Sequence, residues 1–119
     1  MNHADTAQRI VAKIVNRLPS TLRDAAREVP VCLEDRPSEE ITNDGLDPGI
    51  LGLFVGAPRH EHPGEPGPPP QILLYIENIL EECRDSGLPF EEEIRRTYLH
   101  ELGHYLGLDE EALADRDLD

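Results

Sequence analysis

The sequence predicts a small mixed fold of helices and short strands. Apolar residues recur at helical spacing near both ends of the chain, and three short apolar runs between them are bounded by proline, glycine or charged residues. The length of 119 residues suits one compact domain. Hydrophobic residues make up 38% and aromatic residues only 4%, which is typical of a globular protein with an aliphatic core. We therefore expect a single domain over residues 1–119.

The first expected element is an amphipathic helix that ends before Pro19. Asp5 is its expected N-cap. Its apolar face should contain Ala7, Ile10, Val11, Ile14, Val15 and Leu18. A second short helix should follow, capped by Ser20 or Thr21 and ending before Pro30.

Three apolar runs, at residues 29–33, 50–55 and 72–76, predict strands. Residues 35–49, between the first two runs, are expected to form a loop. Residues 57–71, between the last two, carry six of the eleven prolines of the chain. Proline lacks a backbone donor and fixes its own φ angle, so this segment is expected to be a surface loop.

Two further helices are expected before a short tail. The first begins near Asn78 and stops at Gly87, since glycine accommodates the left-handed end of a helix. The second follows Pro89, has three Glu in its first turn and ends at Gly107. Its buried stripe should contain Phe90, Ile94, Tyr98, Leu102, Tyr105 and Leu106. The tail should form one short helix capped by Asp109.

The charge of the chain argues against nucleic acid as a partner, because a net charge of -14 opposes approach to a phosphate backbone. The chain has no apolar run of about 18 residues and no signal-peptide pattern, so we expect no membrane span and a cytoplasmic location. We also expect a monomer. Cys32 and Cys83 are isolated in the sequence, which is typical of buried, reduced thiols.

The residues that indicate chemistry are His100, Glu101 and His104, an HExxH motif on the last long helix. Residues four apart on an α-helix lie about 40° apart around the axis and about 6 Å along it, so both imidazoles can reach one zinc ion. Glu101 points about 100° round from His100, close enough to hold a zinc-bound water without being a ligand. Zinc lowers the pKa of such a water toward about 7, and Glu101 can then act as general base.

Coincidence is the rival interpretation of this motif. HExxH should arise by chance in roughly a few per cent of shuffled chains of this composition. Two His on the helix face opposite the apolar stripe, however, have no core-packing reason to be there. The position therefore favours a metal site.

A catalytic zinc commonly takes three protein ligands and leaves a fourth position for water. Gly107 allows the chain to turn sharply out of the helix, back toward the metal. We favour Glu110 as third ligand, because it holds the eleventh position of HELGHYLGLDE, where HExxHxxGxxH has its last ligand. Asp109 is the neighbouring alternative, but its expected role as N-cap of the tail helix competes with ligation. His60 and His62 in the proline-rich loop are further rivals, although such His are more often solvated.

Three tyrosines and two strands offer further roles in catalysis. Tyr75, Tyr98 and Tyr105 have hydroxyls that could stabilise an oxyanion, although tyrosine on a buried stripe is more often a packing residue. An extended substrate could pair with an exposed edge of the strand at 50–55 or at 72–76.

Several blocks of the sequence together resemble the small bacterial zincin-like metallopeptidases, or minimal zincins, of the HExxHxxGxx[DE] type. The blocks are the leading amphipathic helix, LGLFVGAP, the strand around ILLY and RRTYLHELGHYLGLDEEAL. The resemblance implies an α+β fold, with a small sheet of about three strands packed against helices and the active-site helix near the C-terminus. It also implies a metallopeptidase acting on peptides or proteins. Zinc would bind His100 and His104, Glu101 would be catalytic, and an acidic third ligand would follow Gly107.

The chain departs from the larger metzincins in two ways. Its only methionine is Met1, so it has no Met-turn, and its expected third ligand is not His. A chain of 119 residues also has little C-terminal subdomain to form the lower wall of a cleft. Two other functions therefore stay open, a non-catalytic zinc-binding interaction module and a metal hydrolase of non-peptide substrates.

Overall fold

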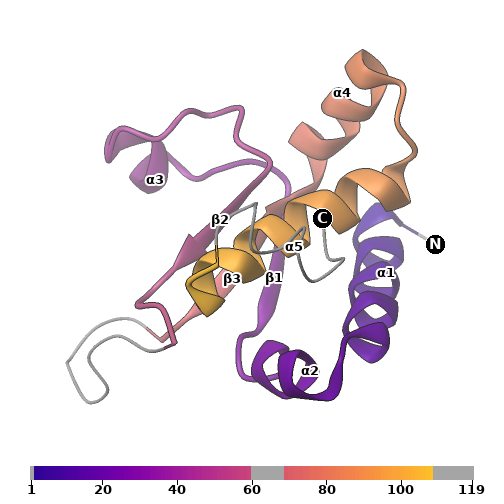
Figure 1. The fold of residues 1–119 in the computed structure, drawn as a ribbon. Helices are drawn as coiled ribbons and strands as arrows, with labels where there is room; N and C mark the ends of the chain where they lie inside the picture. Colours follow the sequence, from indigo (N-terminus) through magenta and orange to yellow (C-terminus); the bar gives the residue numbers. More distant parts are fainter. Residues whose placement is uncertain (1, 60–68, 109–119) are drawn as a thin grey trace.

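The computed structural model describes residues 2–59 and 69–108 (Figure 1). Within these residues the chain forms a three-stranded sheet and five helices, which confirms the predicted α+β class. In chain order the elements are α1 (His3–Arg17), α2 (Ser20–Ala26), β1 (Val31–Glu34), α3 (Glu39–Asn43), β2 (Gly52–Val55), β3 (Gln71–Tyr75), α4 (Ile76–Ser86) and α5 (Phe90–Leu106). The HExxH motif lies on α5, near the C-terminal end of the described residues, as expected.

The sheet has the strand order β1-β3-β2, so β3 is the central strand. β1 pairs with β3 in parallel, and β2 pairs with β3 antiparallel. Ile72 and Leu74 of β3 are fully buried within the main apolar cluster. β2 is an edge strand, and α5 contacts both β2 and β3.

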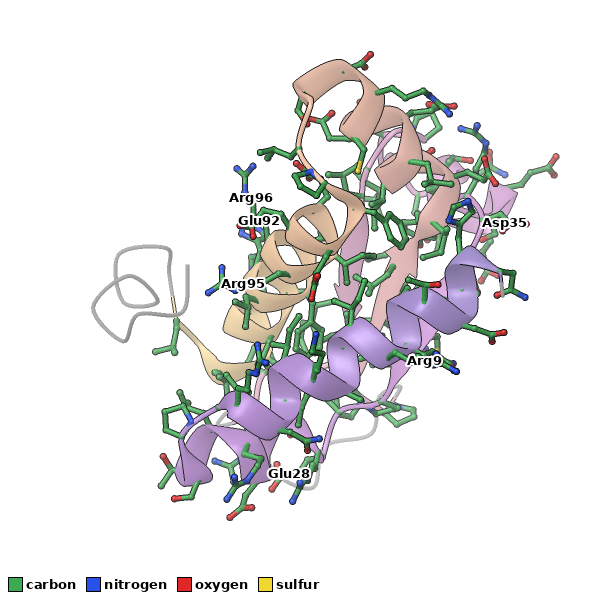
Figure 2. The ribbon with its side chains drawn as sticks, turned by 90° about the vertical axis from the view of Figure 1, so that its right-hand side faces the viewer. Arg9, Glu28, Asp35, Glu92, Arg95 and Arg96 are labelled. Atoms are coloured by element: carbon green, nitrogen blue, oxygen red, sulfur yellow. The ribbon has the colours of Figure 1, made fainter. Side chains whose placement is uncertain are left out.

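Helix α5 is the centre of the packing. It contacts α1 and α4 as well as the sheet, and α1 lies beside it in both views (Figure 2). Its outward side carries Glu92, Arg95 and Arg96, whose side chains point away from α1 (Figure 2). Of the predicted stripe, Ile94, Tyr98, Leu102 and Tyr105 are buried, while Phe90 and Leu106 are half-buried. The predicted aliphatic core is therefore built around this helix.

The helix caps near the N-terminus differ from the prediction. The N-cap of α1 is Asn2, whose side-chain oxygen accepts a 2.8 Å hydrogen bond from the backbone N–H of Asp5. Asp5 itself lies in the first turn, where its charge suits the helix dipole. Helix α2 begins after Pro19 without a side-chain cap, so the expected cap at Ser20 or Thr21 is wrong.

Residues 35–49 contain the short helix α3, where a loop was predicted. Ser38 is its N-cap and accepts a hydrogen bond from the backbone N–H of Ile41. Ile41 is the one apolar residue of α3, and no residue of the helix is buried. The segment therefore has no apolar periodicity from which a helix could be predicted.

The third strand and the helix after it are joined without a loop. β3 begins at Gln71, one residue earlier than predicted, and Ile76 starts α4 instead of ending the strand. Ile76 is buried, so the apolar run continues across the boundary and conceals it. Gly87 ends α4 in the left-handed conformation with φ 79°, as the sequence predicts.

Several other expectations concern the ends, the thiols and the membrane. Cys32 and Cys83 are free thiols, but both are half-buried rather than buried. No helix in residues 2–59 and 69–108 is long and apolar enough to cross a membrane. The tail helix expected after Asp109 and most of the proline-rich segment lie outside the described residues.

Candidate metal centre

The motif lies in the C-terminal half of α5, close to where the helix ends. Pro89 precedes the helix, and Gly107 ends it with φ 72°. The backbone N–H of Leu108 donates a 2.8 Å bond to the carbonyl of Gly103, so the last turn of the helix is closed by the chain that leaves it. His104 therefore lies on a turn whose backbone is fixed.

His100 and His104 are both exposed, and their side chains meet on one side of α5. Their Nε2 atoms lie 3.2 Å apart. Two nitrogens bound to one tetrahedral zinc, each at about 2.0–2.1 Å, are separated by about 3.3–3.4 Å. The pair therefore has the spacing that chelation of one zinc ion requires.

Glu101 completes the group. One ligand atom from each of the three residues can be chosen so that all three atoms lie within 4.8 Å of one another. Among the described residues, this is the group of His, Cys, Asp or Glu side chains that could hold a metal ion. Two imidazole donors with a carboxylate beside them suit a zinc site.

Unlike the two His, Glu101 is buried, with 8% of its surface exposed. Its carboxylate accepts a hydrogen bond from the backbone N–H of Phe54 on β2. Burial raises the pKa of Glu101 above its ordinary value of 4.5, while His100, His104 and the Phe54 N–H act in the opposite direction. The carboxylate therefore lies between the edge of the sheet and the His pair.

The sequence did not indicate Gly52 and Phe54 as part of this site. Gly52 lies against α5 at Thr97 and Glu101, where a side chain would collide. The ring of Phe54 contacts the ring of Tyr105 at a centroid distance of 5.7 Å. A glycine within an apolar strand was the only available signal, since such a glycine often marks close backbone approach.

The three tyrosines are occupied by packing or by other partners. Tyr105 donates its hydroxyl to Glu28 at 2.9 Å. Tyr75 and Tyr98 are fully buried, and their hydroxyls have no hydrogen-bond partner within the described structure. Burial raises the pKa of Tyr98 to about 12. The geometry favours the packing role over an oxyanion role for all three.

The candidates for a third ligand, Glu110, Asp109, His60 and His62, lie outside the described residues. Arg59 and Leu108 are the described residues that come before these candidates in the sequence, and both bond to the last turns of α5. The backbone N–H of Arg59 donates a 2.8 Å hydrogen bond to the carbonyl of Tyr105, and Leu108 closes the last helical turn. Because none of the four candidates is described, the proline-rich loop and the tail both remain predicted sources of a third ligand.

Comparison with known protein families identifies the chain. The family described as "Zincin-like metallopeptidase" matches residues 26–119, well over half of the chain. The matched part extends from the end of α2 through the sheet to α5 and includes the HELGH segment. No curated protein matches the chain. The protein therefore belongs to the zincin-like metallopeptidase family.

Proposed function

We propose that the protein is a zinc-dependent peptidase in which His100 and His104 hold the metal and Glu101 is the general base. The 3.2 Å separation of the two Nε2 atoms, beside a buried carboxylate, is the observation that carries the proposal. Membership of a metallopeptidase family supports peptides or proteins as substrates. Glu110 is proposed as third ligand, with Asp109 as the alternative, because of its place in the motif.

Zinc, when bound, supplies a Lewis acid that polarises a carbonyl and lowers the pKa of water to about 7. Glu101 accepts the proton of the attacking water and delivers it to the leaving amine. The buried position of Glu101 beside the His pair suits this role, and the Phe54 N–H orients the carboxylate. The chain needs no Ser, Cys or Thr nucleophile for this reaction.

The outer edge of β2 is the proposed site for an extended substrate. β3 is paired on both sides, so the expectation that the strand at 72–76 offers an exposed edge is wrong. β2 is paired only with β3 in the described sheet, and it lies along α5 next to Glu101. A peptide added to this edge would pass beside the base, with affinity supplied by main-chain hydrogen bonds to the outward groups of β2 other than the Phe54 N–H.

Zinc content and cleavage of a broad peptide library, measured for wild type and Glu101→Gln, test the proposal. Both proteins should bind one zinc, and the variant should lose cleavage by about a hundredfold or more. Glu91→Gln is the matched control, because Glu91 is an exposed residue in the first turn of the same helix.

Two results would contradict the proposal. If wild type shows no metal-dependent cleavage and His104→Ala unfolds, the protein is a zinc-binding module without catalysis. Cleavage that survives in Glu101→Gln would remove the general base from the scheme.

A further inference from the structure

The outer edge of β2 faces the motif helix with specific backbone groups. The backbone N–H of Tyr75 donates a 2.9 Å bond to the carbonyl of Leu51, at the start of the antiparallel ladder. In such a ladder, residues alternate between bonding to the partner strand and facing away from it. Gly52 and Phe54, one and three residues after Leu51, therefore direct their N–H and C=O groups away from β3.

One of these outward groups contacts the proposed base. The N–H of Phe54 donates to the carboxylate of Glu101, a residue on the buried side of α5. Because the backbone of a strand is fixed, this contact restricts where the flexible carboxylate can lie.

The contact depends on how closely β2 approaches α5, and Gly52 sets that approach. A Cβ atom on Gly52 would lie 2.8 Å from Cγ2 of Thr97 and 3.1 Å from the carbonyl oxygen of Leu73. The same atom would lie 3.3 Å from Cγ of Glu101. Real Cβ contacts below 3.0 Å are essentially absent, so any side chain at this position requires Thr97, the strand or the helix to move.

We propose that Gly52 is a positioning residue for the general base: without a side chain, it lets β2 lie close enough to α5 for the Phe54 N–H to hold the Glu101 carboxylate. The inference rests on the proposed role of Glu101. In Gly52→Ala, β2 moves away from α5 and the Phe54–Glu101 bond lengthens or breaks. The two His side chains are exposed and are not among the atoms nearest to a Cβ on Gly52, so zinc affinity should be retained.

Hydrogen exchange at the Phe54 amide tests the contact without any activity assay. This amide faces away from β3, so its protection depends on Glu101. The amide should be protected in wild type and in Glu101→Gln, which keeps an acceptor oxygen, and should exchange at least tenfold faster in Glu101→Ala and Gly52→Ala. Equal exchange in Glu101→Gln and Glu101→Ala would overturn the proposal, and this pair decides the question even if Gly52→Ala fails to fold.

Kinetics then test the consequence for catalysis. Gly52→Ala should lower kcat by about tenfold to a hundredfold, as misplacement of a catalytic group does, with zinc affinity unchanged within twofold. Adding Thr97→Ser removes the Cγ2 atom of the closest contact and should restore part of kcat. Gly49→Ala is the control, because its Cβ would approach only the side chain of Asp47.

The outcomes separate this inference from the proposed function. The positioning role would be contradicted by a folded Gly52→Ala variant that keeps the kcat of wild type. It would also be contradicted by a variant that loses zinc affinity in parallel with kcat. If wild type cleaves no peptide at all, the proposed peptidase activity fails. The exchange experiment would still establish or overturn the role of Gly52 in holding Glu101.

Discussion

The hydroxyl of Tyr105 donates a 2.9 Å hydrogen bond to Glu28, a residue 77 positions earlier in the chain. Glu28 also accepts two bonds from the Arg59 guanidinium, at 2.8 and 3.1 Å, and the Arg59 backbone N–H donates to the Tyr105 carbonyl. Tyr105 directly follows His104. These three residues therefore tie the last turn of α5 to the connection before β1 and to the segment after β2.

Arg59→Ala should weaken zinc binding by about twofold to tenfold, less than the 10- to 100-fold typical of residues bonded directly to a ligand. The change removes both side-chain bonds to Glu28 and loosens the turn that carries His104. Competition with a chromophoric chelator measures the affinity. Arg36→Ala is the matched control, since Arg36 pairs with Glu81 of α4, away from this turn. Equal affinities for the two variants would show that the cluster does not support the metal site.

Asn78→Ala should lower the free energy of unfolding by about 1–3 kcal/mol, because buried polar groups lose their partners. Asn78 is buried on α4, and its side-chain amide donates to the carbonyls of Pro48 and Ile50, each at 2.8 Å. Its oxygen accepts a 2.9 Å bond from Arg36. Urea denaturation measures this loss for Asn78→Ala and for the control Asn43→Ala. Asn43 is an exposed residue at the end of α3. A loss no larger than that of the control would contradict the assigned role.

Tyr98→Phe should change the pH dependence of the protein's stability, and only in alkaline solution. The Tyr98 hydroxyl is buried without a partner, and burial raises its pKa from 10.0 to about 12. Below pH 10 both the folded and the unfolded chain keep this proton. Above it the unfolded chain loses the proton first, so wild type should lose up to about 2–3 kcal/mol of stability by pH 12.

The phenylalanine variant lacks this ionisation, so its stability curve should be flatter above pH 10. At neutral pH it should be at least as stable as wild type, since a buried hydroxyl without a partner is removed. Thermal unfolding of both proteins between pH 7 and 11 measures the difference. Parallel curves would show that Tyr98 is not the group that titrates.

Local patterns in the sequence predicted most of the elements. Helices α1 and α5 have long apolar faces, and Gly87 and Gly107 take the left-handed conformations expected at helix ends. The strands were placed within about two residues, because proline and glycine bound each apolar run. Helix α3 was missed because it has only five residues and none of them is buried.

The candidate site was only partly predictable, because half of it depends on tertiary contacts. The spacing of His100 and His104 is a property of one helix, and the structure brings their rings together as that spacing requires. The burial of Glu101 depends on Gly52 and Phe54, which lie some fifty residues earlier on another element. No periodicity within a single segment carries such information.

The central claim is that His100 and His104 together hold one zinc ion, and zinc affinity in single variants tests it most directly. Wild type should bind one zinc per chain, and His100→Ala or His104→Ala should each weaken binding by more than about a hundredfold, beyond the effect of losing an indirect partner. His3→Ala is the control, because His3 contacts Phe90 at the opposite end of α5. Its affinity should match wild type within twofold. Wild-type affinity in either site variant, or an equal loss in all three, would contradict the account.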